Sequence, residues 1–182
     1  MRNFDLFISA IDEDNDYKID RFKEYFLHHS DIIFNEISIF ISNNLHEYNK
    51  LQYIIEFYNI FDSDEKTLNI IRKIGNLIFE LYIKIIDDLI SNREEYCIYQ
   101  YVDFFYTNNF FLKERTQIFF KKSYHILFSN LNTEESSWFI ISCYRLIDLY
   151  INYYKDISLM EEYLVIGKNE LLKKYIIKNI FS

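Results

Sequence analysis

The stretch DSDEKTLNIIRKIGNLIFELYIKIIDDLIS, residues 62–91, is the longest strongly periodic segment in the first half of the chain. From residue 68 onward, polar residues recur at about every fourth position: Arg72/Lys73, Asn76, Glu80, Lys84, Asp87/Asp88 and Ser91. The residues between them are apolar, apart from Asn69 and Gly75. A helix with one narrow polar stripe and apolar groups on its other faces is surrounded by other helices. We therefore predict that residues 62–91 form the core helix.

The composition predicts an all-α fold. The 182 residues include no proline and only two glycines, Gly75 and Gly167. The turns of all-β folds depend on glycine and proline, whereas helices joined by short polar turns need neither. Half of the residues are hydrophobic, so disorder is not expected. The length fits a single helical domain, residues 1–182, with a full core.

Apolar residues spaced by three and four positions predict about nine helices. The expected ranges are 2–11, 19–28, 31–42, 46–61, 62–91, 94–106, 110–128, 133–154 and 158–182, with Ser30–Asp31, Asp62–Asp64, Asn132 and Ser158 as caps. Gly167 is expected to kink or divide the last helix. After the first helix, the order predicts antiparallel pairs, and both a compact bundle and a short irregular α-solenoid are open.

The charge is concentrated in one half of the chain. Residues 1–91 carry 9 basic and 17 acidic groups, whereas residues 92–182 carry 11 of each, so the first half holds the whole net charge of −8. A nucleic-acid binder would show a basic face instead. The acidic half suits either solubility or attraction to a basic partner.

Targeting and redox signals are absent from the sequence. The start, MRNFDLFISAI, is interrupted by Asp5 and lacks a signal-peptide cleavage site. No apolar run is long enough to predict a membrane span. Cys97 and Cys143 have no metal-binding spacing and are expected to be buried thiols in a reducing compartment. Cytoplasmic localisation is the expectation.

The stretch Asp12–Asp20, DEDNDYKID, resembles the calcium loop of an EF-hand, with acidic residues at loop positions one, three, five and nine. Tyr17 stands where that loop needs glycine, and Lys23 stands where it needs a bidentate acid. We expect a solvated acidic loop between two helices, and a calcium-responsive module is the last of the functions considered.

No catalytic or cofactor-binding constellation is predicted. His28 and His29 are adjacent, so on a helix they point about 100° apart and cannot share a metal ion. Cys97 or Cys143 could form a nucleophile–base pair with His125, but nothing in their spacing supports such a pair. Two glycines are too few for an oxyanion or phosphate loop. We expect no enzyme activity, no metal and no cofactor.

Two further surfaces are candidates for binding. An aromatic face is predicted from the tyrosines Tyr96, Tyr99, Tyr101, Tyr106, Tyr144, Tyr150, Tyr153 and Tyr154, although helix–helix packing also explains them. The last helix alternates lysines with Leu171, Leu172, Ile176 and Ile177, a pattern typical of a membrane-surface helix or of a terminal helix docked on its own domain.

In its make-up the chain is similar to bacterial immunity proteins of contact-dependent and polymorphic toxin systems. The similarity rests on small size, acidity and an excess of Ile, Asn, Lys, Tyr and Phe, which suggests an AT-rich coding sequence. It implies a non-catalytic partner of a basic, nuclease-type toxin. The acidic groups that would meet the toxin are Asp12, Glu13, Asp14, Asp16, Asp20, Glu56, Asp62, Asp64 and Glu65.

Two other functions stay open. A viral Bcl-2-like host modulator fits the length and helix count, although the Asn-Trp-Gly-Arg motif of that family is absent, since Phe139 follows Trp138. A helical-repeat scaffold fits the spacing of the predicted helix pairs.

Overall fold

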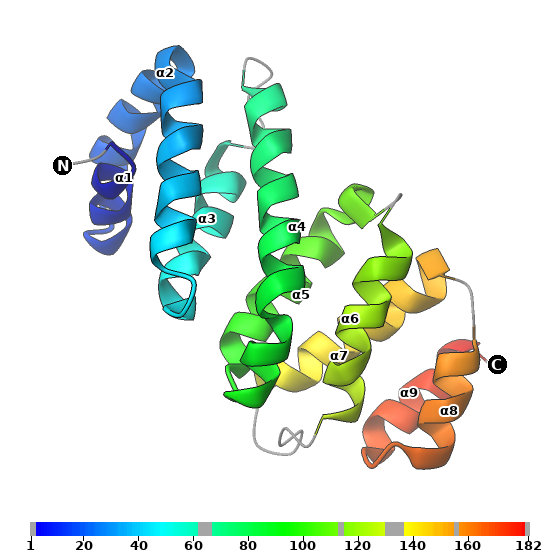
Figure 1. Ribbon diagram of the computed structural model, residues 1–182. Coiled ribbons are helices and arrows are strands. Elements are labelled where there is room, and N and C mark those ends of the chain that lie inside the picture. The colour runs from blue at the N-terminus through cyan, green and yellow to red at the C-terminus, as the bar shows by residue number, and fades with distance from the viewer. Residues whose placement is uncertain (1–2, 62–66, 113–114, 130–136, 155–156, 181–182) are drawn as a thin grey trace. The chain divides into compact units, whose positions relative to one another are not determined.

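The computed structural model describes residues 3–61, 67–112, 115–129, 137–154 and 157–180 (Figure 1). The α-helices are α1 (Asn3–Asp12), α2 (Asp16–Asn43), α3 (Tyr48–Phe61), α4 (Leu68–Ser91), α5 (Glu95–Thr107), α6 (Thr116–Phe128), α7 (Ser137–Leu149), α8 (Ser158–Ile166) and α9 (Glu170–Ile180). A 3₁₀ segment η1 (Asn109–Leu112) and a π-helical segment η2 (Tyr150–Tyr154) complete the elements. No strand occurs in these ranges, so the predicted all-α class is confirmed.

The chain divides into two compact units, Met1–Phe79 and Glu80–Ser182, and the boundary falls inside α4. Each unit has its own buried side chains. The single domain expected from the length stays a prediction.

Phenylalanine side chains make the core of the first unit. Phe57 of α3 is fully buried, and its ring lies 4.5–6.1 Å, between centroids, from those of Phe4, Phe7, Phe22, Phe26 and Phe61. These rings come from α1, α2 and α3, so one aromatic cluster joins all three helices. Glu36 of α2 adds a polar link, because its carboxylate accepts hydrogen bonds from the Asn3 side chain (3.0 Å) and the Phe4 backbone N–H (2.8 Å).

α2 corrects the prediction of two separate helices over residues 19–28 and 31–42. The helix continues through Ser30–Asp31 and is kinked at His29, which has non-helical angles of φ −133° and ψ 29°. The His29 ring stacks on Tyr25 at 4.1 Å, and its Nδ1 donates to the Tyr25 carbonyl oxygen at 3.1 Å. No glycine or proline stops the backbone there, so the helical hydrogen bonds resume after the kink.

α4 has the one-sided polarity that the sequence predicts. Its polar positions from Arg72 to Ser91 are exposed or half-buried, whereas its apolar residues Ile70, Ile71, Ile74, Ile78, Leu81, Tyr82, Ile85, Ile86 and Leu89 are buried. The core-helix prediction is therefore confirmed over residues 68–91. The predicted cap at Asp62–Asp64 lies outside the described residues, as does the cap predicted at Asn132.

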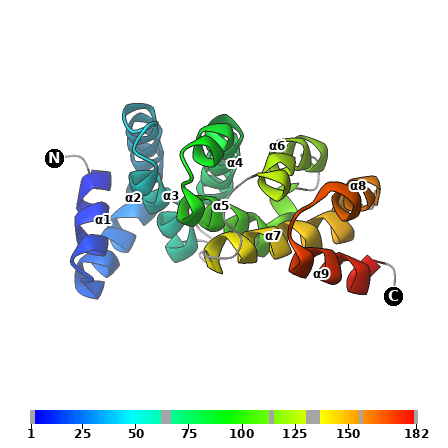
Figure 2. The ribbon, with the colours of Figure 1, turned by 90° about the horizontal axis from the view of Figure 1, so that it is seen from below.

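In the second unit, α5 packs most extensively against α7 rather than against its neighbour in sequence, α6. The two helices run parallel: Trp138 at the start of α7 meets Tyr96 and Tyr99 near the start of α5, and Arg145 pairs with Asp103 farther along. Figure 2 shows α5 and α7 in one layer and α6 in the other. Alternate helices therefore lie side by side, as they do in stacked helical hairpins.

The ends of the later helices differ from the predicted ranges. The helix predicted over 110–128 begins as the 3₁₀ segment η1, and α6 starts only at Thr116. α8 begins at Ser158, and Ile157, which precedes it, makes no side-chain cap hydrogen bond. The cap predicted at Ser158 stays a prediction.

Gly167 divides the last predicted helix into α8 and α9, as the sequence suggested. A Cβ atom at Gly167 would lie 2.5 Å from the Tyr163 carbonyl oxygen and 2.6 Å from its ring, so a side chain does not fit there. α9 docks on the second unit through Leu172 and Ile176, which are fully buried.

Candidate partner-binding surface

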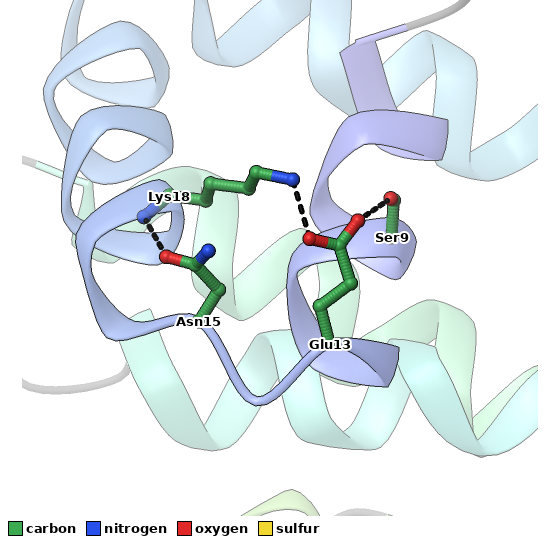
Figure 3. Close-up of polar contacts among 4 residues, drawn as sticks. All are labelled: Ser9, Glu13, Asn15 and Lys18. Atoms are coloured by element: carbon green, nitrogen blue, oxygen red, sulfur yellow. Dashed lines mark hydrogen bonds and ion pairs between the residues drawn. The ribbon is translucent and has the colours of Figure 1, made fainter.

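The turn between α1 and α2 holds most of the predicted binding residues. α1 ends at Asp12, and α2 begins at Asp16 after the short connection Glu13–Asp14–Asn15. Asn15 caps α2, since its side-chain oxygen accepts the Lys18 backbone N–H at 3.1 Å (Figure 3). Asp14 has a left-handed φ of 49°, which aspartate tolerates better than most residues. The cap and this residue fix the course of the turn.

Glu13 is held in place on the outer side of this turn. Its carboxylate accepts hydrogen bonds from Ser9 Oγ at 2.9 Å and from Lys18 Nζ at 2.5 Å (Figure 3). The hydrogen bond from Lys18, followed by that from Ser9, lowers the pKa of Glu13. Asp20, one turn along α2 from Asp16, pairs in the same way with Lys23 at 3.3 Å. Such exposed pairs contribute little to stability, so their effect is to orient the carboxylates.

Asp14 and Asp16 are exposed and form no ion pair with any residue in the described ranges. Asp16 lies in the first turn of α2, where a negative charge also favours the helix. Between these acids and Asp20 stands Tyr17, whose side chain is 70% exposed. We call Asp12, Glu13, Asp14, Asp16, Tyr17 and Asp20 the acidic turn.

Tyr17 is a further candidate for partner binding, and in the sequence it stands out only as a misfit in a calcium loop. An exposed tyrosine among carboxylates offers apolar area and a hydroxyl to a partner. One sequence signal could have indicated Tyr17: a large aromatic side chain stands in an acidic stretch that is expected to be exposed to solvent.

Glu56 of α3 is close to the acidic turn but differs from its members. Tyr53 donates its hydroxyl to the Asp12 carboxylate, and this hydrogen bond is the main cause that raises the pKa of Tyr53 to about 12. Glu56 is half-buried, and its Oε2 atom makes no hydrogen bond to a described residue. Burial, and then the charge of Asp12, raise the pKa of Glu56. The predicted residues Asp62, Asp64 and Glu65 lie outside the described residues.

The Glu56→Gln substitution is expected to stabilise the protein at pH 7. A carboxyl whose pKa is higher in the folded than in the unfolded state lowers the free energy of unfolding as the pH rises from the unfolded-state pKa through the folded-state pKa. The gain in Tm should therefore be present at pH 7 and shrink as the pH falls below about 4, where the carboxyl is protonated in both states. Thermal unfolding of the variant and of the unmodified chain, at pH 7 and at about pH 3.5, measures this difference in Tm.

Glu24→Gln is the matched control, because it makes the same change of charge at an exposed position of α2. A gain in Tm from this control as large as that from Glu56→Gln would show that general charge reduction, rather than the burial of Glu56, is the cause.

The acidic turn does not form a calcium loop. In an EF-hand, twelve successive residues wrap around the ion, but α2 begins at Asp16, so the last two thirds of the corresponding stretch are helical. Within the described part of the chain, no three His, Cys, Asp or Glu side chains are grouped so that they could hold a metal ion.

The tyrosines of α5 and α7 form a second, partly exposed surface. The Trp138 ring lies 5.3 Å from Tyr96 and 4.7 Å from Tyr99, between centroids. The Arg145 guanidinium lies over Tyr99 at 5.1 Å and over Tyr106 at 5.4 Å. Of the other tyrosines predicted here, Tyr101 and Tyr150 are buried, Tyr144 packs on Tyr175, Tyr153 is exposed, and the side chain of Tyr154 is not described. Much of the predicted aromatic face is therefore helix packing.

No protein-family model, no curated protein and no solved structure matches the chain. The similarity to toxin-immunity proteins thus rests on size, charge and composition alone. None of the helices in the described ranges is both long and apolar enough to cross a bilayer.

Proposed function

We propose that this chain is a non-catalytic protein-binding module of the cytoplasm, and that it acts as an immunity protein. In this proposal it binds a cognate toxin with a basic, nuclease-type surface and neutralises it by covering that surface. The observation that carries the proposal is the acidic turn, in which exposed carboxylates surround an exposed tyrosine on a rigidly capped connection.

Charge and apolar area have separate roles in such a contact. The exposed carboxylates of Asp14 and Asp16 attract a basic surface over several ångströms and speed the encounter. The Tyr17 side chain then becomes buried against the partner and anchors the complex, since tyrosine is enriched among the residues that dominate binding energy. Because the toxin is neutralised by being covered, the immunity protein needs no catalytic group.

The double substitution Asp14→Asn/Asp16→Asn is expected to weaken binding about tenfold, mainly by slowing association. Tyr17→Ala is expected to weaken it about thirtyfold by speeding dissociation, as is typical when a hot-spot residue of about 2 kcal/mol is truncated. The partner in this measurement is the product of the gene directly upstream, and surface plasmon resonance gives both rate constants.

Glu80→Gln/Asp88→Asn is the matched control, since it removes the same charge from exposed positions of α4. An equal loss from this control would leave only a general charge effect and refute the role of the acidic turn.

A helical-repeat scaffold is the second candidate, and the parallel packing of α5 on α7 favours it. Scaffolds of this kind bind partners along stacked helices. A partner whose affinity is unchanged by the acidic-turn substitutions but is lost on Trp138→Ala would support this function instead.

A further inference from the structure

Three aliphatic side chains project from the corner between α8 and α9. Val165 is 79% exposed, Ile166 is 56% exposed and Leu171 is 57% exposed. They lie on either side of the buried Gly167, where the chain changes direction from α8 to α9. We call Val165, Ile166 and Leu171 the apolar corner. Single exposed aliphatic residues are common on proteins, whereas here three of them fall within seven residues of sequence.

Lysines accompany the apolar corner along α9. Lys174 and Lys178 follow Leu171 at helical spacing on the exposed side, and neither forms an ion pair within the described ranges. α8 and α9, residues 158–180, together carry four lysines and the acids Glu161, Glu162 and Glu170, in a chain whose net charge is −8. The lysines lie after Gly167, so the α9 side of the apolar corner is basic.

The buried side of α9 shows that this exposure does not come from an undocked helix. Leu172 and Ile176 are fully buried, and Tyr175 donates a hydrogen bond of 2.7 Å to Asp148 of α7. The structure thus shows a terminal helix docked on its own domain through one face, with lysine and aliphatic side chains on the other face.

A basic, apolar surface could bind either another protein or a lipid bilayer, and the kinds of side chain in it distinguish these two partners. Protein interfaces are enriched in Trp, Tyr and Arg and depleted in Lys, and the apolar corner with its lysines has none of the former. Bilayer surfaces instead take up aliphatic side chains below the headgroups, while lysines bind anionic lipids. Composition therefore favours a lipid surface.

We propose that the apolar corner, together with Lys174 and Lys178, is a peripheral binding site for bilayers that contain anionic phospholipid. Val165, Ile166 and Leu171 enter the headgroup region, and the two lysines contact lipid phosphate and carboxylate groups.

The test is co-sedimentation of the full chain with large vesicles, either of phosphatidylcholine alone or of phosphatidylcholine mixed with phosphatidylserine. Binding is expected to the mixed vesicles only. Lys174→Gln/Lys178→Gln should weaken it about 25-fold, about fivefold for each lysine. Val165→Ser/Ile166→Ser/Leu171→Ser should also remove most of the bound fraction, and circular dichroism verifies that each variant is folded.

Two control variants make the same chemical changes elsewhere. Ile32→Ser/Ile39→Ser alters exposed aliphatic residues of α2, and Lys84→Gln/Lys121→Gln removes two exposed lysines. Both are expected to bind the mixed vesicles as the unmodified chain does. The proposal is overturned if the chain does not sediment with mixed vesicles, binds neutral vesicles equally well, or loses binding as strongly in the controls.

Discussion

Phe57→Ala is expected to lower the free energy of unfolding by about 3–5 kcal/mol, the range typical of truncating a buried aromatic side chain. Phe57 is fully buried and contacts rings from α1, α2 and α3, so its loss leaves a cavity at the meeting point of all three helices. Small proteins are stable by only about 5–15 kcal/mol. The substitution should therefore unfold a large part of the first unit at mild denaturant concentrations.

Urea titration followed by circular dichroism measures this loss. Phe110→Ala is the control, because Phe110 is exposed and its truncation leaves no buried cavity. The control should cost less than about 1 kcal/mol. A loss for Phe57→Ala as small as that of the control would show that the phenylalanine cluster does not hold the first unit together.

Tyr82→Ala is expected to have a comparable effect on the second unit, again about 3–5 kcal/mol. The Tyr82 ring lies 5.3 Å from Phe105 of α5 and 5.4 Å from Phe119 of α6, between centroids. Its hydroxyl lies 2.6 Å from Ser123 Oγ in a fully buried hydrogen bond. α4 is thus joined to α5 and α6 by one side chain that combines ring packing with a polar contact.

The milder substitution Tyr82→Phe separates the two contributions. It keeps the ring but leaves the buried Ser123 hydroxyl without this partner, which should cost about 1–3 kcal/mol. Adding Ser123→Ala removes the other half of the pair, so the double variant should be less destabilised than the sum of the two single variants. Strict additivity in urea titrations would show that the hydrogen bond contributes nothing.

The sequence was most informative where one helix face decides the structure. The polar residues of α4 recur with the helical period, and the apolar residues between them are buried as that period requires. The start of α2 was less predictable. An acidic loop was expected between the predicted helices 2–11 and 19–28, but Asn15 caps the helix and Asp16 favours its first turn. The connection is therefore shorter than expected.

Contacts between distant residues could not be predicted from local patterns. The parallel packing of α5 on α7 depends on Trp138, Tyr99 and the Asp103–Arg145 pair, which are separated by about 40 residues and have no shared sequence signal. The environment of Glu56 also depends on a contact between distant residues. The hydrogen bond from Tyr53 of α3 to Asp12 of α1 joins these two helices, and the charge of Asp12 acts on Glu56. The acids of the turn were proposed from the sequence, whereas Tyr17 became a candidate only through its exposure.

The most direct test of the proposed function is the association rate constant between this chain and the product of the gene directly upstream, measured across a range of salt concentrations. The account predicts a one-to-one complex whose association slows steeply as salt rises, and slows at low salt when Asp14 and Asp16 are replaced by asparagine. The absence of a complex, or an association rate that salt does not change, would contradict it.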